Sequence, residues 1–305
     1  MDLVNHLNDR LLFAVPKKGR LYQQCVELLQ GSDIKFHRSN RLDIALSTNL
    51  PIALVFLPAA DIPLFVGEGR VSLGITGQDQ VAEAEVAVDE IADLGFGSCK
   101  LQIEVPENGP YTDAKQLIGK TVVTSFPNLA SQYFKKLEAD QSDNKNNNNN
   151  NNKLKTQIKY VGGSVEAACA LGIADAVVDL VESGETMRAA GLKAIETIFD
   201  TSAVLIASKK PTHPELVDLI VSRIKGVLAA SKYVLCNYNC PRDKLDVVLT
   251  ITPGRRAPTI SSIEEQDWVA VSSMVEKKKI AQVMDELRQA GAEDVLVFAI
   301  SNSRV

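Results

Sequence analysis

The sequence predicts an α/β protein with a separate C-terminal unit. Up to Lys232, short apolar runs alternate with helical patterns, as at 11–15, 53–57 and 71–75, each followed by a turn and a helix. This alternation is typical of a mostly parallel sheet covered by helices. From Tyr233 onward the order is strand, helix, strand, strand, helix, strand, which predicts a ferredoxin-like unit. The 305 residues, 45% of them apolar, allow two or three domains with cores of their own.

The first strands end in turns that suit a ligand. The turn after strand 11–15 is basic, and strand 71–75 runs into a polar turn. Ligands of parallel sheets bind beyond the C-terminal ends of the strands, so these turns are predicted to converge with the loop at 58–61. The basic turn suits an anion, although a solvated basic loop explains it equally well. The candidate residues at these ends are Lys17, Gly19, Arg20, Gly77 and Asp79.

A second set of elements begins with strand 121–124. The strand ends in Thr124, a turn begins with Ser125, and a helical pattern follows. Residues 140–153 contain an asparagine run that cannot bury enough apolar surface to order itself, so we expect a disordered insertion without catalytic chemistry. A further strand at 158–161 precedes a helix that Glu166 opens.

A polar turn after the apolar run 176–178 is the strongest functional signal. A strand that stops in a small-residue turn and opens a helix leaves backbone N–H groups unpaired, which favours phosphate binding. No lysine lies inside the turn, which separates it from the lysine-bearing loop of P-loop nucleotidases. Its residues are Glu182, Ser183, Gly184, Glu185 and Thr186.

Carboxylates precede this turn. A carboxylate can only accept hydrogen bonds, which suits the hydroxyls of a sugar. Asp179, and secondarily Asp175, therefore indicate a ribose 5-phosphate when combined with the turn. A helix cap made by Ser183 and Thr186 explains the same pattern without any ligand.

Composition narrows the class of protein. The net charge is −5 and the basic residues are scattered, which argues against a nucleic-acid or anionic-membrane partner. The five cysteines lack paired zinc spacing, so we expect reduced thiols and a cytoplasmic protein. No apolar run reaches membrane-spanning length, and the first residues are too polar for a signal peptide. We expect no metal ligated by protein side chains alone.

Several turns together resemble one family, the long form of ATP phosphoribosyltransferase, the first enzyme of histidine biosynthesis. Each fragment alone is weak, but their order covers nearly the whole chain except the asparagine run. The matching fragments include Lys17-Lys18-Gly19-Arg20, Asn40-Arg41-Leu42, Gly74-Ile75-Thr76-Gly77-Gln78-Asp79, Phe96-Gly97-Ser98-Cys99-Lys100, Gly163-Ser164-Val165-Glu166, Asp175-Ala176-Val177-Val178-Asp179, Ser183-Gly184-Glu185-Thr186, Asn239-Cys240-Pro241-Arg242 and Thr252-Pro253-Gly254.

The resemblance implies two periplasmic-binding-protein-like (type II) α/β domains and a C-terminal regulatory domain. Their implied limits are 1–97 with 201–228, then 98–200, then 229–305. It also implies transfer of the 5-phosphoribosyl group of 5-phosphoribosyl 1-diphosphate to N1 of ATP, with Mg²⁺ as cofactor. Feedback inhibition by histidine and homo-oligomers, from dimer to hexamer, are implied as well.

The resemblance also assigns roles. Asp179, Lys17 and Arg20 would be the catalytic residues, with Arg41 facing the polyphosphates or the nucleotide. Glu166 is a candidate contact for Mg²⁺ or the ribose, although an early-helix carboxylate is as good an explanation. Histidine would contact the regulatory domain. The residues implied there are Asn239, Thr259 and Met274.

Two features limit this interpretation. Pro58 stands where the family often has an arginine, so the loop at 58–61 contributes less to the leaving group or another cation replaces it. Asn239 stands where relatives can have Asp, which predicts weaker histidine binding. Two rival functions remain: a non-catalytic amino-acid sensor with a solute-binding cleft, and a phosphoribosyltransferase for another base.

Overall fold

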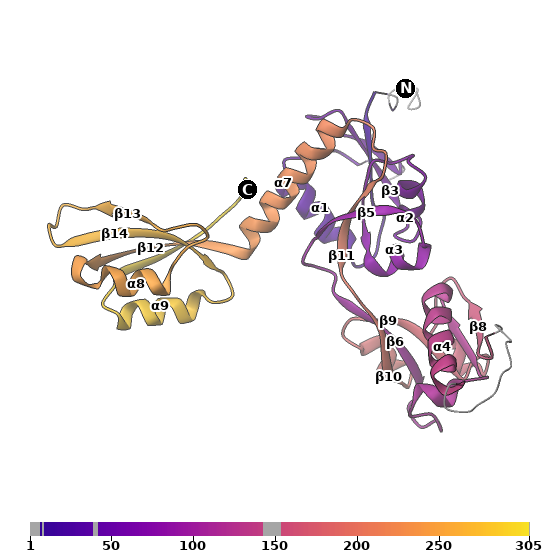
Figure 1. Ribbon diagram of the computed structural model, residues 1–305. Helices are drawn as coiled ribbons and strands as arrows, with labels where there is room; N and C mark the ends of the chain where they lie inside the picture. Colours follow the sequence, from indigo (N-terminus) through magenta and orange to yellow (C-terminus); the bar gives the residue numbers. More distant parts are fainter. Residues whose placement is uncertain (1–6, 8, 39–41, 143–153, 305) are drawn as a thin grey trace. The chain divides into compact units, whose positions relative to one another are not determined.

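The computed structural model describes residues 7, 9–38, 42–142 and 154–304 (Figure 1). The chain divides into two compact units. The first contains residues 1–25, 37–47 and 51–212, and the second contains 26–36, 48–50 and 213–305. The sequence-based domain limits stay a prediction. They differ from the compact units, because residues 26–36, 48–50 and 213–228 group with the second unit and residues 98–200 share the first unit with most of 1–97.

The first unit holds a six-stranded sheet in the order β2-β3-β1-β4-β11-β5. Its neighbours β3, β1 and β4 are parallel, whereas β2, β11 and β5 run antiparallel to the strands beside them. The prediction of a mostly parallel sheet is therefore wrong. The strands are β1 (Leu11–Pro16), β2 (Ile44–Leu46), β3 (Ile52–Leu57), β4 (Leu73–Gly77), β5 (Val88–Asp93) and β11 (Ala203–Ser208).

Helices α1 (Tyr22–Gly31), α2 (Ile62–Gly67) and α3 (Gln78–Ala84) follow β1, β3 and β4. Ile62 and Val66 of α2 pack with Ala14, Val204 and Ile206 of the sheet in one buried cluster. Because β1, β3 and β4 are parallel neighbours, the turns at their C-terminal ends lie at one edge, as predicted.

A five-stranded sheet in the same unit has the order β10-β6-β9-β7-β8. Its core includes Leu101, Ile103, Val122, Phe134 and Val178. Its strands are β6 (Cys99–Pro106), β7 (Thr121–Thr124), β8 (Gln157–Tyr160), β9 (Ala176–Val181) and β10 (Leu192–Thr201), and its helices are the 3₁₀ turn η2 (Ala114–Leu117), α4 (Pro127–Ser142), α5 (Ala167–Ala170) and α6 (Glu185–Ala189).

The predicted disordered insertion at 140–153 was placed too early in the chain, because residues 140–142 continue α4. The rest of the predicted insertion, 143–153, lies outside the described residues.

The chain passes between the two sheets twice, after β5 and after β10. When β2 is left out, the strand order of the first sheet is β3-β1-β4-β11-β5. The second sheet, read from β8, has the order β8-β7-β9-β6-β10. In each, a strand that follows a crossing (β11 or β6) is inserted beside the third strand and runs antiparallel to it. This shared order confirms two α/β domains of periplasmic-binding-protein type.

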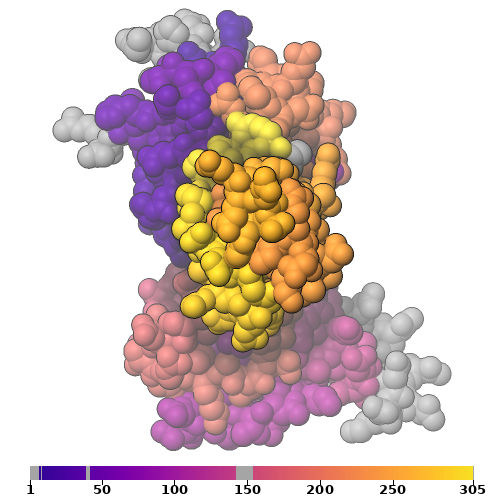
Figure 2. Space-filling view, turned by 90° about the vertical axis from the view of Figure 1, so that its left-hand side faces the viewer, coloured from indigo at the N-terminus to yellow at the C-terminus, as the bar shows by residue number. Residues whose placement is uncertain are grey.

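The second unit contains a four-stranded antiparallel sheet in the order β13-β14-β12-β15. Helices α8 and α9 lie side by side on one face of it (Figure 1), and their Val248, Val283 and Leu287 pack on Cys236, Tyr238 and the valines of β14. This confirms the ferredoxin-like unit, yellow and orange in Figure 2. Its elements are α7 (Pro214–Lys232), β12 (Tyr233–Pro241), η3 (Arg242–Lys244), α8 (Leu245–Ile251), β13 (Thr259–Ser262), β14 (Trp268–Glu276), α9 (Ile280–Gln289) and β15 (Glu293–Ala299).

Candidate functional site

The polar turn lies between β9 and α6. β9 extends to Val181, beyond the apolar run seen in the sequence, and α6 begins at Glu185. Gly184 has a left-handed φ of 74°, and a side chain there would meet the guanidinium of Arg188. The Glu185 N–H donates to the Ser183 hydroxyl at a long 3.4 Å, so the helix-cap interpretation holds weakly. The hydroxyl of Thr186 bonds to none of the described residues, which leaves it free to bind a ligand.

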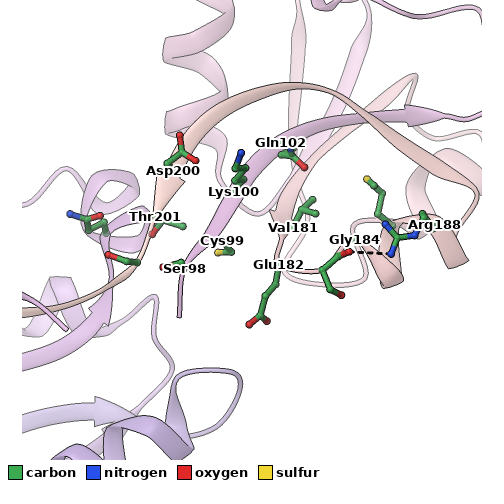
Figure 3. A pocket seen from close by; sticks show the side chains of 14 residues that line it. Ser98, Cys99, Lys100, Gln102, Val181, Glu182, Gly184, Arg188, Asp200 and Thr201 are labelled. Carbon is green, nitrogen blue, oxygen red and sulfur yellow. Dashed lines mark hydrogen bonds between the residues drawn. The ribbon is translucent and has the colours of Figure 1, made fainter. Parts of the chain in front are cut away.

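A cavity of about 630 Å³ lies on one side of this turn (Figure 3). Lys100 of β6 and Arg188 of α6 line it, and Arg188 Nη2 donates to the Ser183 carbonyl at 3.1 Å. Two cations therefore stand beside a turn whose own residues contain no lysine. The sequence argument missed both, because Arg188 follows the turn by two residues and Lys100 is distant in sequence.

A second cavity of about 240 Å³ shares the wall formed by Val181, Glu182, Ser183, Gly184 and Met187. It is acidic: five carboxyl groups and one cation line it. The charged residues are Glu104, Glu166, Asp179, Glu182, Glu185 and Arg20. The structure thus brings together Asp179, Glu166, Arg20 and the whole predicted turn.

Burial controls the charge of two of these carboxyls. Burial, and then the nearby Asp179 and Glu166, raise the pKa of Glu104 to about 7. Burial also raises the pKa of Asp179, while the Leu180 N–H, which donates to Asp179 Oδ1 at 2.8 Å, lowers it. Glu104 is a site residue that sequence reasoning missed. The only signal was a glutamate inside an apolar strand.

The basic turn contributes Arg20 and not Lys17. Arg20 donates to the Gly97 carbonyl, and its Nη2 lies 3.7 Å from the Asp79 carboxylate. Asp79 is buried and accepts a hydrogen bond of 2.6 Å from Thr201, so it holds Arg20 at the cavity wall. Lys17 instead pairs with Asp43 at 2.7 Å and lines neither cavity. Arg41 lies outside the described residues.

Other candidates are placed elsewhere. Asp175 precedes β9, at the end of the strand opposite the turn, and accepts hydrogen bonds from Tyr111 (2.8 Å) and the Thr121 N–H (3.0 Å). The N–H of Thr121, above all, keeps the pKa of Asp175 below its usual value. Gly19, Gly77, Thr124 and Ser125 line neither cavity.

The predicted histidine contacts share one face of the C-terminal sheet. Asn239 and Met274 alternate with buried neighbours and point away from α8 and α9, and Thr259, on the exposed strand β13, pairs with Ser272 on the same face. Asn239 pairs with Ala270 and Leu235 with Met274, so Asn239 and Met274 stand about 13 Å apart along the strands. The Asn239 side chain donates to Asp294 at 3.1 Å.

Two searches of the described residues found nothing. No group of three or more His, Cys, Asp or Glu residues there could hold a metal ion by itself. Within the same residues, no helix combines the length and apolarity that crossing a bilayer requires.

Comparisons with known proteins agree over the whole chain. The family model for ATP phosphoribosyltransferase matches residues 58–226, and that for the HisG C-terminal domain matches 230–302. The ATP phosphoribosyltransferase of Yarrowia lipolytica is 70% identical, and that of Saccharomyces cerevisiae is 62% identical, each over the full length of both chains. In the solved structure of the ATP phosphoribosyl transferase (HisG:HisZ) complex from Thermotoga maritima, one chain aligns with a TM-score of 0.56 and 22% identity, over 70% of this chain and 96% of that one, which supports the fold.

Proposed function

The chain belongs to the ATP phosphoribosyltransferase family, and from that premise we propose the reaction that it catalyses. It transfers the 5-phosphoribosyl group of 5-phosphoribosyl 1-diphosphate to N1 of ATP, giving N1-(5-phosphoribosyl)-ATP and diphosphate, the first step of histidine biosynthesis. The observation that carries the proposal within the structure is the polar turn between two cavities, one lined by Lys100 and Arg188 together with Glu182 and Asp200, the other by five carboxyl groups and one cation.

The residues of the two cavities support a division of the sugar substrate. Phosphate oxygens suit the turn itself, which has Lys100 and Arg188 on the side of the larger cavity and the Thr186 hydroxyl, a donor, on the side of the smaller one. The carboxyls of the smaller cavity accept hydrogen bonds from ribose hydroxyls, the role we assign to Asp179. Arg20, the cation of that cavity, would face the diphosphate.

The chemistry needs no nucleophilic side chain. Adenine N1 already carries a lone pair, so the residues of the site mainly hold it in line with the anomeric carbon. Holding two reactants in register can lower a barrier by about 7–11 kcal/mol. The fixed positions of Asp179, on β9, and Arg20, held by Asp79, suit this role.

We also propose Mg²⁺ as cofactor. Carboxylate oxygens are the hard ligands that Mg²⁺ accepts, usually one or two from the protein beside substrate phosphates. The described residues offer no complete cage, so the diphosphate would carry most of the ion's coordination, with Glu166 as the candidate protein ligand. When bound, Mg²⁺ neutralises charge on the leaving diphosphate.

We also propose that histidine inhibits the enzyme, that the chain forms homo-oligomers and that it is located in the cytoplasm. The sheet face that carries Asn239 supports inhibition by histidine. Exposed Leu296 and Phe298 on the same sheet support self-association. The five cysteines, all free, are consistent with a reducing compartment.

The two rival functions have weaker support. An amino-acid sensor would leave the phosphate turn and its cations without a ligand, and full-length relatives at 60–70% identity are transferases by name. A phosphoribosyltransferase for another base would usually lack the C-terminal domain that the family model matches.

Diphosphate release with ATP, 5-phosphoribosyl 1-diphosphate and Mg²⁺ tests the function and the site. We expect turnover by the wild type. Thr186→Ala should raise KM for the sugar diphosphate about 10- to 100-fold, the loss of one hydrogen bond to a charged group. Asp179→Asn should lower kcat/KM about as much, because an amide replaces the acceptor-only carboxylate.

The control is Thr112→Ala, an exposed threonine of the same unit that lines neither cavity and should keep wild-type kinetics. Full turnover and unchanged KM in both site variants would show that the site is assigned wrongly. A wild type that releases no diphosphate would exclude the reaction itself.

A further inference from the structure

We propose that Glu104 is a positioning residue that hydrogen-bonds a ribose hydroxyl of the sugar substrate in the smaller cavity. This inference rests on the proposed function and adds a residue to its site.

The strand pattern aims Glu104 into that cavity. Along β6, Leu101, Ile103 and Val105 are fully buried in the core of the second sheet, so Gln102 and Glu104 point to the opposite face. Gln102 pairs with Asp179 and Glu104 with Val177, which puts Glu104 and Asp179 on one face as diagonal neighbours about 7–8 Å apart. Both line the cavity with Glu166.

The carboxyl of Glu104 has no partner among the described residues. Only 3% of the residue is exposed, and no hydrogen bond or ion pair joins its side chain to any of them. Its oxygens are not among the buried atoms of the described residues that lack a partner, so they reach the space of the cavity that Glu104 lines. Water or a ligand in the cavity therefore supplies their hydrogen bonds, since polar groups in native proteins rarely stay unsatisfied.

The neighbours of Glu104 restrict that ligand. Asp179 and Glu166 line the cavity beside it, so carboxyl groups surround Glu104. The one cation of the cavity, Arg20, is engaged by Asp79 and the Gly97 carbonyl. A phosphate would meet like charge here. An uncharged donor fits, and a ribose hydroxyl is the donor that the proposed substrate brings to this side of the turn.

Kinetics of Glu104→Ala and Glu104→Gln test the proposal. Alanine should raise KM for 5-phosphoribosyl 1-diphosphate about tenfold or more, and leave KM for ATP within twofold. Glutamine keeps the shape and an accepting oxygen, so it should recover KM to within about threefold of wild type. Glu107→Ala, an exposed glutamate just beyond β6, is the control and should match wild type.

A purely structural role would show up differently. If Glu104 served only to pack β6, Glu104→Ala would lower Tm, whereas removing a carboxyl that faces the cavity among other carboxyls should leave Tm unchanged or raise it. An unchanged KM for the sugar diphosphate in Glu104→Ala, equal rises in both KM values, or failure of glutamine to restore KM would overturn the proposal.

Calorimetric binding of ribose 5-phosphate separates this inference from the proposed function. If the wild type binds it about tenfold more tightly than Glu104→Ala but shows no turnover, the reaction is wrong and the role of Glu104 stands. If turnover occurs and both proteins bind ribose 5-phosphate equally, only the role of Glu104 is wrong. If the wild type does not bind ribose 5-phosphate, both the proposed function and the role of Glu104 are wrong.

Discussion

At the scale of single residues, burial distinguishes a structural hydroxyl from a ligand-binding one. Thr124 is fully buried at the end of β7. Its hydroxyl donates to the Val178 carbonyl at 2.7 Å and accepts the Phe126 N–H at 2.9 Å. Ser125, the next residue, is half-exposed, and its hydroxyl contacts none of the described residues through a hydrogen bond. Only Ser125 has a hydroxyl left for substrate.

Thr124→Val should therefore destabilise the protein and leave substrate affinity unchanged. Valine matches the shape of threonine but leaves the Phe126 N–H without an acceptor. This loss should lower the free energy of unfolding by about 1–3 kcal/mol. Urea unfolding measures the stability and initial rates give KM. Ser125→Ala is the matched control, with a stability change within about 0.5 kcal/mol. A Thr124→Val variant of wild-type stability with a raised KM would show that Thr124 binds substrate.

The residues of the site were only partly predictable. Asp179 and the turn at 182–186 are contiguous, so a local pattern reveals them. Glu104 and Lys100 reach the same site from another strand through the β6–β9 register, which no local pattern shows. Asp175 shares a motif with Asp179 but lies at the other end of β9, a separation that the local pattern does not show.

At the scale of elements, one glutamate links helices of the two sheets. Glu83 lies near the end of α3, which follows the first sheet, and α4 packs on the second. Its carboxylate accepts the N–H groups of Asn128 (2.8 Å) and Leu129 (2.9 Å), and its carbonyl accepts the Asn128 side chain (2.8 Å). Glu83 therefore caps the first turn of α4, whose amides have no partner inside the helix.

Removing this cap should loosen α4 locally. For Glu83→Ala, we expect about 2- to 30-fold faster hydrogen exchange at the Asn128 and Leu129 amides, equivalent to a lost cap of about 0.5–2 kcal/mol. Glu85→Ala is the control: it removes a hydrogen bond of 2.7 Å to Gln132 and leaves both amides capped. Equal exchange in the two variants would contradict the capping role.

At the scale of the whole molecule, the sequence predicts which segments are strands better than it predicts how they pair. The buried runs at β1, β3 and β9 stand out because they are apolar on both faces. β5 and β10 were missed because their half-exposed faces carry charged residues. The antiparallel strand β11 enters the first sheet after the chain has crossed to the second sheet and back, a long-range feature that alternation of strands and helices does not encode.

The arrangement of strands in the C-terminal sheet also determines which charges lie at the predicted histidine site. The sequence predicts weak binding, because Asn239 carries no charge for the ammonium group. The structure places Asp294 at 3.1 Å from the Asn239 side chain, on the neighbouring strand β15. A carboxylate is thus present beside Asn239, although it comes from another part of the chain. We expect this pair to bind the ammonium group together.

Millimolar histidine should therefore inhibit diphosphate release by the wild type. Both Asn239→Ala and Asp294→Asn should raise the inhibitory concentration, and Asp294→Asn about tenfold or more, since it removes the charge while keeping the shape. Asp285→Asn removes an equal charge from the exposed side of α9, and its inhibition should match wild type. If Asp294→Asn and Asp285→Asn respond alike, the charge that histidine meets lies elsewhere, and the open face of the sheet is not its site.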